Sequence, residues 1–433
     1  TGPMHIGHGR GAILGDSITR LLEFTGYAAQ REYYVNSDNT QARRFGESVL
    51  ARLHGQEPPE GGYTGEYVKE IAEQARHDLP GIDQMPEEDA APLLRHYAIQ
   101  KMVDQIAASL ARVNVHYDGW FWENVLWESG LAQSAIERLR ESGYIKERDG
   151  ALWFAPALDE KEAGGEPIVE EEDRVVIRSN GQPTYFASDL GYLLSRFEQR
   201  GYSRVIEVWA ADHHGYVPRM KSAAAALGID EERLVIIIHQ MVNLQEGAAG
   251  SAQKMSKRAG RFVTLDELVD RVGSDPVRYF YLLRSPDTTI EFDLELAVTQ
   301  GNENPVYYAQ YAHARLCNVE VAASERHASL PELADVSLLV MPWELDVARQ
   351  LAFWPEVVED AARLLEPHRI PYYIQDLAAA VHRYYHAGNA QTEHRIVVDD
   401  PQLTRARLEL CRAARHTLRT ALELIGVTAP ERM

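Results

Sequence analysis

The chain has 433 residues with 45% hydrophobic and 25% charged side chains, which excludes a disordered or low-complexity protein and predicts about three domains from length alone. Its formal net charge of −21 argues against a surface coated with nucleic acid, although a local basic face could still bind RNA. The two cysteines, Cys317 and Cys411, exclude a disulfide framework and a CxxC zinc knuckle, and no apolar run approaches the roughly 18 residues of a membrane span. Since there is no secretory signal peptide either, we expect a cytoplasmic protein with no membrane partner.

The first half of the chain predicts alternating helices, strands and loops. The glycine-rich residues 7–11 open a helix whose apolar side chains recur at helical spacing until Gly26, a typical stop. Strands are expected at 28–35, 151–154 and 174–179. Loops rich in proline, glycine or acid are expected at 54–63, 79–92 and 159–173, the first two on either side of an inserted helix.

The second half predicts a strand–helix–strand unit followed by helices. Two short apolar runs, 205–211 and 234–239, indicate buried parallel strands joined by a helix at 217–228. Thr264 and Glu267 form a capping box, and helices are expected to start before Pro276 and at Asn304-Pro305, with later breaks at 327–333 and 387–402.

Two domains follow from these elements. We predict an α/β domain with a parallel sheet over residues 1–300, with insertions near 54–112 and 145–175. An all-helical domain is expected over residues 301–433.

The segment His5-Ile6-Gly7-His8 begins a helix, and its chemistry suits a phosphate group. Gly7 lets a ligand approach the backbone, and the helix start offers free N–H groups at the positive end of the helix dipole. His5 and His8 lie three residues apart and share a face, from which both can donate hydrogen bonds to phosphate oxygens. A surface histidine pair or a metal pair remains open for this motif alone.

A second cationic segment, Lys254-Met255-Ser256-Lys257, lies between Gly250 and Gly260. Two lysines on such a loop can close over a triphosphate and stabilise a leaving pyrophosphate. A solvated charge cluster is the alternative for so short a motif.

Together and in this order, the two segments resemble the HIGH and KMSK signatures of the class I aminoacyl-tRNA synthetases. Longer stretches, among them EYYVNSDNTQ, RVVIRSNGQPTYFASDLGY and NPVYYAQYAHARL, are similar to arginyl-tRNA synthetases over essentially the whole chain. The resemblance implies a Rossmann-type catalytic domain with helical insertions and a helical-bundle anticodon-binding domain. It also implies a monomer that uses ATP, with Mg2+ and no protein-bound metal, to activate L-arginine and transfer it to the 3′-terminal adenosine of tRNA(Arg).

The resemblance further implies roles for individual residues. The residues with catalytic roles are His5, His8, Lys254 and Lys257. Those implied to contact ATP are Gly7, Met241, Val242, Met255 and Ser256.

A guanidinium substrate requires a buried carboxylate held for two hydrogen bonds. Tyr185 and Asp189 are four residues apart, so they share a helix face, and they match the family's arginine-binding tyrosine and aspartate. A helix cap or a salt bridge is the alternative role for Asp189. Asp212 follows a predicted strand, at the carboxyl end where α/β sheets bind ligands, and the resemblance implies that it lines the arginine pocket. A metal site at Asp212-His213-His214 lacks a suitably spaced third ligand.

Near the C-terminus, residues 403–425 form one predicted amphipathic helix. Its apolar stripe consists of Leu410, Ala414, Leu418, Ala421 and Ile425. A second stripe consists of Arg405, Arg412, Arg415 and Arg419, which we call the arginine stripe. A solvated basic face is the ordinary interpretation, whereas the resemblance implies that these arginines bind tRNA.

The sequence also departs from the family pattern. Residues 36–41 read NSDNTQ where the family has N-D-x-G-T-Q, and Ala210 replaces a usual glycine. The chain begins at Thr1, without the strand and substrate-binding asparagine that precede this position in the family, which predicts a fragment of a longer protein. Two other functions stay open: a non-catalytic tRNA-binding paralogue, and a small-molecule nucleotidyltransferase of the HxGH superfamily. Intact signatures argue against the first, and the long helical domain argues against the second.

Overall fold

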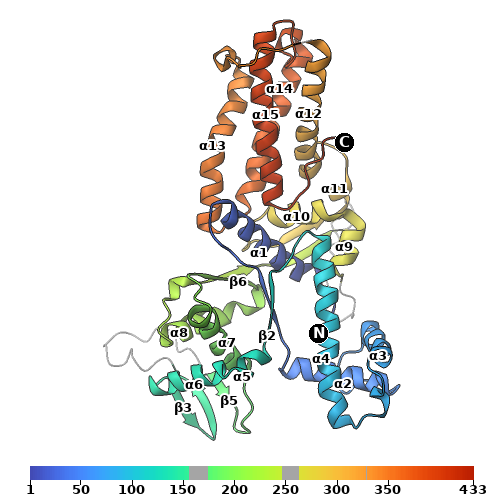
Figure 1. The fold of residues 1–433 in the computed structure, drawn as a ribbon, viewed down its shortest axis with the longest axis vertical. Helices are drawn as coiled ribbons and strands as arrows, with labels where there is room; N and C mark the ends of the chain where they lie inside the picture. Colours follow the sequence, from blue (N-terminus) through green and yellow to red (C-terminus); the bar gives the residue numbers. More distant parts are fainter. Residues whose placement is uncertain (156–173, 246–262, 328) are drawn as a thin grey trace. The chain divides into compact units, whose positions relative to one another are not determined.

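A computed structural model describes residues 1–155, 174–245, 263–327 and 329–433 (Figure 1). The chain divides into two compact units. The first unit consists of residues 1–3, 32–108 and 117–238, and the second of residues 4–31, 109–116 and 239–433. Among the described residues, no helix is both long and apolar enough to cross a membrane.

The first unit contains a parallel strand pair with a helical insertion. Strand β1 (Glu32–Val35) pairs with β2 (Gly119–Trp122), and Glu32 lies opposite Gly119. Between them come α2 (Thr40–Leu53), α3 (Glu66–Asp78), η1 (Ile82–Gln84) and α4 (Glu87–Arg112). The core of the insertion consists of apolar side chains such as Phe45, Ile71 and Leu94.

Two boundaries in this part differ from the sequence predictions. The strand starts at Glu32 rather than at residue 28, because only 32–35 find a partner strand. Helix α4 starts at Glu87, inside the loop expected at 79–92, because three acidic residues in its first turn favour a helix start over a loop.

The rest of the first unit comprises a small antiparallel sheet and a second α/β part. Its elements are α5 (Asn124–Glu128), α6 (Leu131–Glu141), β3 (Ile145–Arg148), β4 (Ala151–Phe154), β5 (Arg174–Ile177), α7 (Tyr185–Leu194), η2 (Ser195–Gln199), β6 (Val205–Ala210), η3 (Ala211–Tyr216), α8 (Val217–Ala226), η4 (Glu231–Arg233) and β7 (Leu234–His239). β3, β4 and β5 pair antiparallel, which confirms the two strands predicted there, while the acidic run 159–173 lies outside the described residues.

β6 and β7 form a two-stranded sheet with α8 between them in the chain, so the predicted strand–helix–strand unit is confirmed. The strands are mostly half-buried, although we expected them to be buried. The reason is that, in the described part of the chain, their sheet has no third strand to cover its edges.

The second unit holds the first helix, a second parallel strand pair and the helical domain. Its elements are α1 (Ile6–Phe24), β8 (Val242–Gln245), α9 (Leu265–Val272), α10 (Ser274–Leu282), β9 (Ile290–Asp293), α11 (Leu294–Val298), α12 (Pro305–Arg326), η6 (Val336–Leu338), α13 (Pro342–Leu364), α14 (Arg369–Ala390), η7 (Thr392–His394) and α15 (Pro401–Leu424). β8 and β9 pair parallel. The Thr264–Glu267 capping box is present, and Asn304 caps α12 as predicted.

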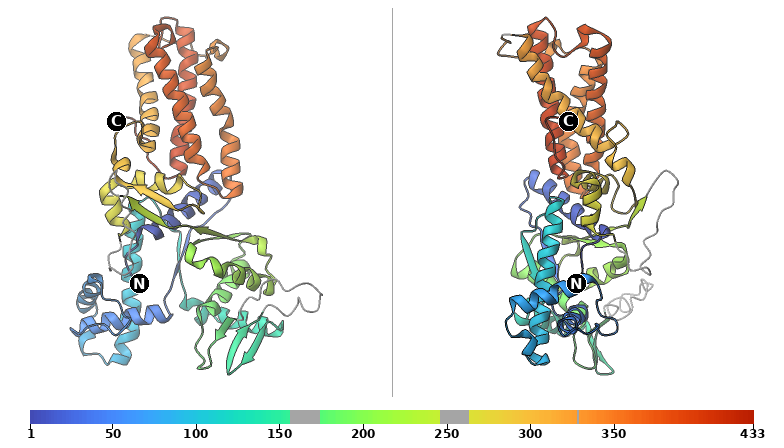
Figure 2. Two further views of the ribbon diagram at one scale, coloured as in Figure 1. Left: turned by 180° about the vertical axis from the view of Figure 1, so that it is seen from behind. Right: turned by 90° about the vertical axis from the view of Figure 1, so that its right-hand side faces the viewer.

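Helices α12–α15 pack side by side as a bundle, which Figure 2 shows from two further sides. The predicted apolar stripe of α15, including Leu410, Ala414 and Leu418, is buried in it. The breaks differ from those predicted: α13 starts only at Pro342, and α14 continues to Ala390 before α15 begins at Pro401. A proline at the start of α13 and of α15 fixes these helix starts.

Candidate functional site

Helix α1 starts directly after His5, and this histidine caps it. The His5 Nδ1 atom accepts hydrogen bonds from the backbone N–H groups of Gly7 and His8, at 3.1 and 3.3 Å. The two histidine rings stack with their centroids 3.5 Å apart, which confirms their shared face. The expectation that these N–H groups are free was wrong, because the His5 imidazole accepts from both. A phosphate would therefore compete with His5 for the same donors.

Further along α1, Arg10 is fully buried although it carries a charge. Its Nη1 donates to the Gln240 carbonyl at 2.7 Å and its Nη2 to the Ser285 carbonyl at 2.9 Å. Burial lowers the pKa of Arg10 to about 10. Since Gln240 precedes Met241 and Val242, Arg10 ties α1 to the segment predicted to bind ATP. In that segment Met241 is 49% exposed and Val242 is buried.

The predicted lysine loop lies outside the described residues. This loop contains Lys254 and Lys257, predicted to be catalytic, and Met255 and Ser256, predicted to contact ATP.

In the first unit, Asp189 lies on α7, one turn after Tyr185. The Tyr216 hydroxyl donates to Asp189 Oδ2 at 2.5 Å. The pKa of Asp189 is nevertheless raised to about 7, mainly by desolvation and to a smaller extent by the nearby carboxylates of Glu207 and Glu123. Tyr185 is 44% exposed, so its side chain is accessible from solvent.

A second carboxylate, Glu123, is only 3% exposed and follows the end of β2. Its Oε1 accepts from the Ser188 hydroxyl at 2.9 Å, and its Oε2 accepts from Asn39 Nδ2 at 3.2 Å. Burial raises the pKa of Glu123. The sequence analysis did not select this residue, although a carboxylate at the end of the aromatic run GWFWEN was a usable signal.

Negative charge is in excess around these two side chains, which we call the carboxylate pair. Within the described ranges, neither Glu123 nor Asp189 forms an ion pair. Two guanidinium groups nearby are already paired: Arg196 is bonded to Glu207, and Arg95, which lines the cavity beside Glu123, is bonded to Asp38 at 2.9 Å. Burial raises the pKa of the Tyr34 hydroxyl, and the two carboxylates raise it as well. Within the described residues, this buried hydroxyl has no hydrogen-bond partner. Among the described residues, the cations near the pair are therefore bonded to other carboxylates.

A polar cavity of about 230 Å3 adjoins Glu123 at the carboxyl ends of the parallel strands β1 and β2. Asp38 and Asn124 line it, and the Asp38 N–H donates to Glu123 Oε2 at 3.4 Å. Ligands of open α/β sheets bind at this end of the strands.

Asp212, the third residue predicted to bind arginine, lies at the start of η3. Its side chain is 73% exposed, and its Oδ1 lies 3.9 Å from His213 Nε2. Tyr216, four residues later on η3, is the residue of this segment that reaches Asp189. Among the described residues, no group of three or more side chains is arranged to hold a metal ion.

In the helical domain, the arginine stripe is paired with carboxylates. Arg412 and Arg415 both bond to Glu320 on α12, at 2.6 and 3.1 Å. Arg419 reaches Glu431 at 3.2 Å, and Arg405 reaches Glu409 at 2.9 Å. Each of these contacts would have to be weakened or shared before the stripe could bind phosphates.

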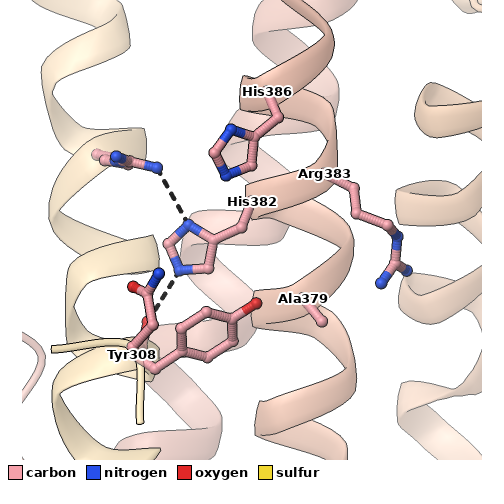
Figure 3. A pocket seen from close by; sticks show the side chains of 7 residues that line it. Tyr308, Ala379, His382, Arg383 and His386 are labelled. Atoms are coloured by element: carbon pink, nitrogen blue, oxygen red, sulfur yellow. Dashed lines mark hydrogen bonds between the residues drawn. The ribbon is translucent and has the colours of Figure 1, made fainter. Parts of the chain in front are cut away.

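Between α12 and α14 lies a cavity of about 190 Å3 with cationic and aromatic walls, shown in Figure 3. Arg315 Nη1 lies 3.2 Å from His382 Nδ1, and His382 Nε2 lies 3.1 Å from the Tyr308 carbonyl. Because an arginine can only donate, His382 is neutral and carries its proton on Nε2. Burial lowers the pKa of His382, which agrees with that state. Arg383 and His386 complete the wall.

Comparison with known proteins identifies the family. The family model for the catalytic domain of class I tRNA synthetases (R) matches residues 1–57 and 64–278, and the model for the DALR anticodon binding domain matches residues 309–433. The arginine–tRNA ligases of Syntrophotalea carbinolica and Moorella thermoacetica are each 44% identical, and each alignment covers 100% of this chain and 76% of the relative. The chain belongs to the arginyl-tRNA synthetase family.

A solved structure supports the same assignment. The arginyl-tRNA synthetase of Campylobacter jejuni matches with a TM-score of 0.85 and 34% identity, covering 100% of this chain and 91% of that chain. The chain is thus an arginine–tRNA ligase with a class I catalytic fold and a helical anticodon-binding domain. The alternatives of a nucleotidyltransferase and a non-catalytic paralogue are not favoured by these matches.

Proposed function

We propose that the carboxylate pair of this arginyl-tRNA synthetase binds the guanidinium group of L-arginine. The observation that carries the proposal is that two buried carboxyl groups, Glu123 and Asp189, have no ion-pair partner among the described residues. A guanidinium presents several N–H donors in one plane and remains charged at every pH of interest. Two carboxylates facing it would each accept charge-assisted hydrogen bonds.

Tyr185 and Asp212 complete the proposed arginine site with different weights. Tyr185 shares the α7 face with Asp189 and can add a neutral hydrogen bond. Asp212 is exposed, so water screens any charge interaction that it makes. We assign it a minor role in attracting the substrate.

For ATP, we propose that His5, Gly7 and His8 bind the phosphates and that the backbone at Met241 and Val242 meets the adenine. Arg10 holds this second segment through the Gln240 carbonyl. The two histidines would neutralise charge that develops as the arginine carboxylate attacks the α-phosphorus and pyrophosphate leaves. We assign Lys254, Met255, Ser256 and Lys257 to the same step on sequence grounds.

The second step uses no further protein group in this proposal. A hydroxyl of the 3′-terminal adenosine of tRNA(Arg) attacks the arginyl carbonyl, and AMP leaves. ATP enters as its magnesium complex, which we treat as a substrate. We propose that a monomer carries out both steps in the cytoplasm, with catalysis within about residues 1–300 and anticodon binding within 301–433.

For the tRNA, we propose two candidate surfaces in the helical domain. The arginine stripe offers positive charge, but its members are paired with carboxylates. The α12–α14 cavity offers Arg315, Arg383 and His386 beside the Tyr308 ring; of these, Arg383 is ion-paired with Asp346, whereas Arg315, within the described residues, bonds only neutral groups, His382 and the Tyr311 hydroxyl. A cationic cavity with aromatic walls suits an unstacked RNA base better than a paired stripe does, so we favour the cavity.

Arginine-dependent aminoacylation by the Glu123→Gln variant tests the proposed function. The variant keeps the shape of the side chain and removes one of the two charges. We expect kcat/KM for arginine to fall by roughly tenfold or more while the KM for ATP stays within about twofold. A normal kcat/KM for arginine would remove Glu123 from the substrate site.

A further inference from the structure

One buried guanidinium joins four segments of the second unit. Arg278 on α10 is 0% exposed. Its Nη2 donates to Asp16 on α1 at 2.6 Å and to the Ser17 hydroxyl at 3.2 Å. Its Nη1 donates to the Val113 carbonyl at 2.7 Å, and its Nε donates to the Ile425 carbonyl at 2.6 Å. Arg278 therefore contacts the first helix, the turn after α4 and the turn that ends α15.

The same junction has further bonds on both sides. Arg20 donates to Asp16 at 2.7 Å and to the carbonyls of Asn114 and Glu423 at 2.9 and 3.4 Å. The Asn114 side chain donates to the Gly426 carbonyl at 3.4 Å. Helix α1 also packs against α13 and α15 at the lower end of the bundle in Figure 1. Polar contacts and packing thus link α1 directly to the end of the helical domain.

Gly426 shows how little free space the junction has. Its φ is +69°, and a Cβ atom there would lie 2.3 Å from the Arg278 guanidinium. Any displacement of the turn at 425–426 must therefore move Arg278, and through Asp16 it must move α1.

We propose that Arg278 is a positioning residue for catalysis, which holds the helix bearing His5 and His8 in register with the turn that ends the tRNA-binding domain. The proposal rests on the proposed role of the two histidines at ATP. The buried, hydrogen-bonded junction fixes the position of α1 relative to this turn.

A second buried pair provides a matched control. Arg407 on α15 donates to Glu344 on α13 at 2.7 Å, and both side chains are buried. Arg407 also donates to the carbonyls of Glu393 and Arg395, at 2.9 and 2.6 Å. Its chemistry matches that of Arg278, but its hydrogen-bond partners among the described residues all lie within the helical domain and none lies on α1.

The test compares Arg278→Lys with Arg407→Lys in the full chain, measuring the unfolding midpoint, kcat and the KM for tRNA, with assays run well below both midpoints. A lysine keeps the charge but loses the fork that reaches several partners. We expect both variants to unfold at lower temperature, while only Arg278→Lys lowers kcat, by roughly tenfold or more. Its KM for tRNA should stay within about twofold, because no proposed tRNA contact is removed.

Gly426→Ala disturbs the junction without removing a charge and serves if Arg278→Lys fails to fold. Its control is Gly26→Ala, which has φ +94° and no atom within 4 Å of the added Cβ. We expect only Gly426→Ala to lower kcat. Equal kcat losses in Arg278→Lys and Arg407→Lys, or an unchanged kcat in Arg278→Lys and Gly426→Ala, would overturn the positioning role. A wild-type chain without arginine-dependent charging would instead contradict the proposed function.

Discussion

Asp189 and Glu123 in the first unit and Asp16 in the second are carboxylates withdrawn from water, yet their surroundings differ. The carboxylate pair has no ion-pair partner within the described residues, and burial raises the pKa of both members. Burial would also raise the pKa of Asp16, but Arg278 and Arg20 outweigh it, so the pKa of Asp16 is lowered. The first set has no counter-charge from the protein and therefore holds its protons more tightly, whereas Asp16 is neutralised by arginines of the protein itself.

This difference distinguishes a binding site from a structural junction. Burying a charge is unfavourable unless an opposite charge and hydrogen bonds compensate it. Where the protein supplies the compensation, as at Asp16 and at Glu344 with Arg407, the group stabilises the fold. Where it does not, as at the carboxylate pair, a cationic substrate supplies it. The predictions below test this distinction.

The largest expected effect is on stability. Asp16→Asn leaves the fully buried Arg278 without its counter-charge, so we expect the free energy of unfolding to fall by roughly 3–5 kcal/mol. Asp189→Asn removes an uncompensated charge and should leave the free energy of unfolding unchanged or higher. Urea denaturation of both variants measures the difference. A similar loss in both would mean that Asp189 has a structural partner after all.

The next effect is on substrate use. Asp189→Asn removes a charged acceptor for the guanidinium, and we expect kcat/KM for arginine to fall by roughly 10²-fold or more. Tyr185→Phe should cost less, because it deletes one neutral hydrogen bond at most. Asp212→Asn is the exposed control and should change kcat/KM by less than about threefold. Aminoacylation at varied arginine concentration measures all three.

Asp189 of the carboxylate pair and Asp16 of the Arg278 junction should also differ in how they make the free energy of unfolding depend on pH. Native Asp189 holds its proton up to about pH 7, whereas the ordinary value is 3.8, so the native state binds more protons between these values. The free energy of unfolding contributed by Asp189 therefore falls as pH rises through that window. The pKa of Asp16 is lowered, so its contribution is present above 3.8 and is lost as pH falls below it. We would measure the free energy of unfolding across pH by denaturation. The decrease between pH 3.8 and about 7 should be smaller in Asp189→Asn, and the decrease below pH 3.8 should be smaller in Asp16→Asn.

The smallest expected effect concerns tRNA affinity in the helical domain. Arg315→Ala should weaken tRNA binding by roughly tenfold, since it removes a cation from the α12–α14 cavity. Combined alanine replacement of Arg412, Arg415 and Arg419 should cost less per residue, because their carboxylate partners already compensate them. Titration at several salt concentrations separates the two. A steeper loss of affinity and of salt dependence in the triple variant would favour the arginine stripe.

Local signals made much of the fold predictable from sequence. The Thr264–Glu267 capping box, Asn304 before Pro305 and the periodic α15 stripe each act within a few residues, and each formed as expected. The helix that carries Tyr185 and Asp189 formed for the same reason.

The remainder depended on contacts between distant residues. Arg278 and Asp16 are 262 positions apart, so no spacing rule relates them. The arginine stripe was predicted from spacing along α15, but Glu320, which pairs with two of its members, lies on α12. The His5 ring nitrogen accepts hydrogen bonds from the backbone of Gly7 and His8 in its own helix. The motif alone does not decide whether His5 bonds to this backbone or to a phosphate.

The most direct test of the central claim is calorimetric titration of L-arginine into the chain near pH 6.5, in two buffers of different ionisation enthalpy. If the carboxylate pair is uncompensated until arginine binds, binding must lower the pKa of Asp189 and release its proton. We therefore predict buffer-dependent heats that correspond to roughly half a proton or more per arginine in the wild type. We predict buffer-independent heats in Asp189→Asn. Wild-type heats that do not depend on the buffer would contradict the claim that the guanidinium binds at this carboxylate.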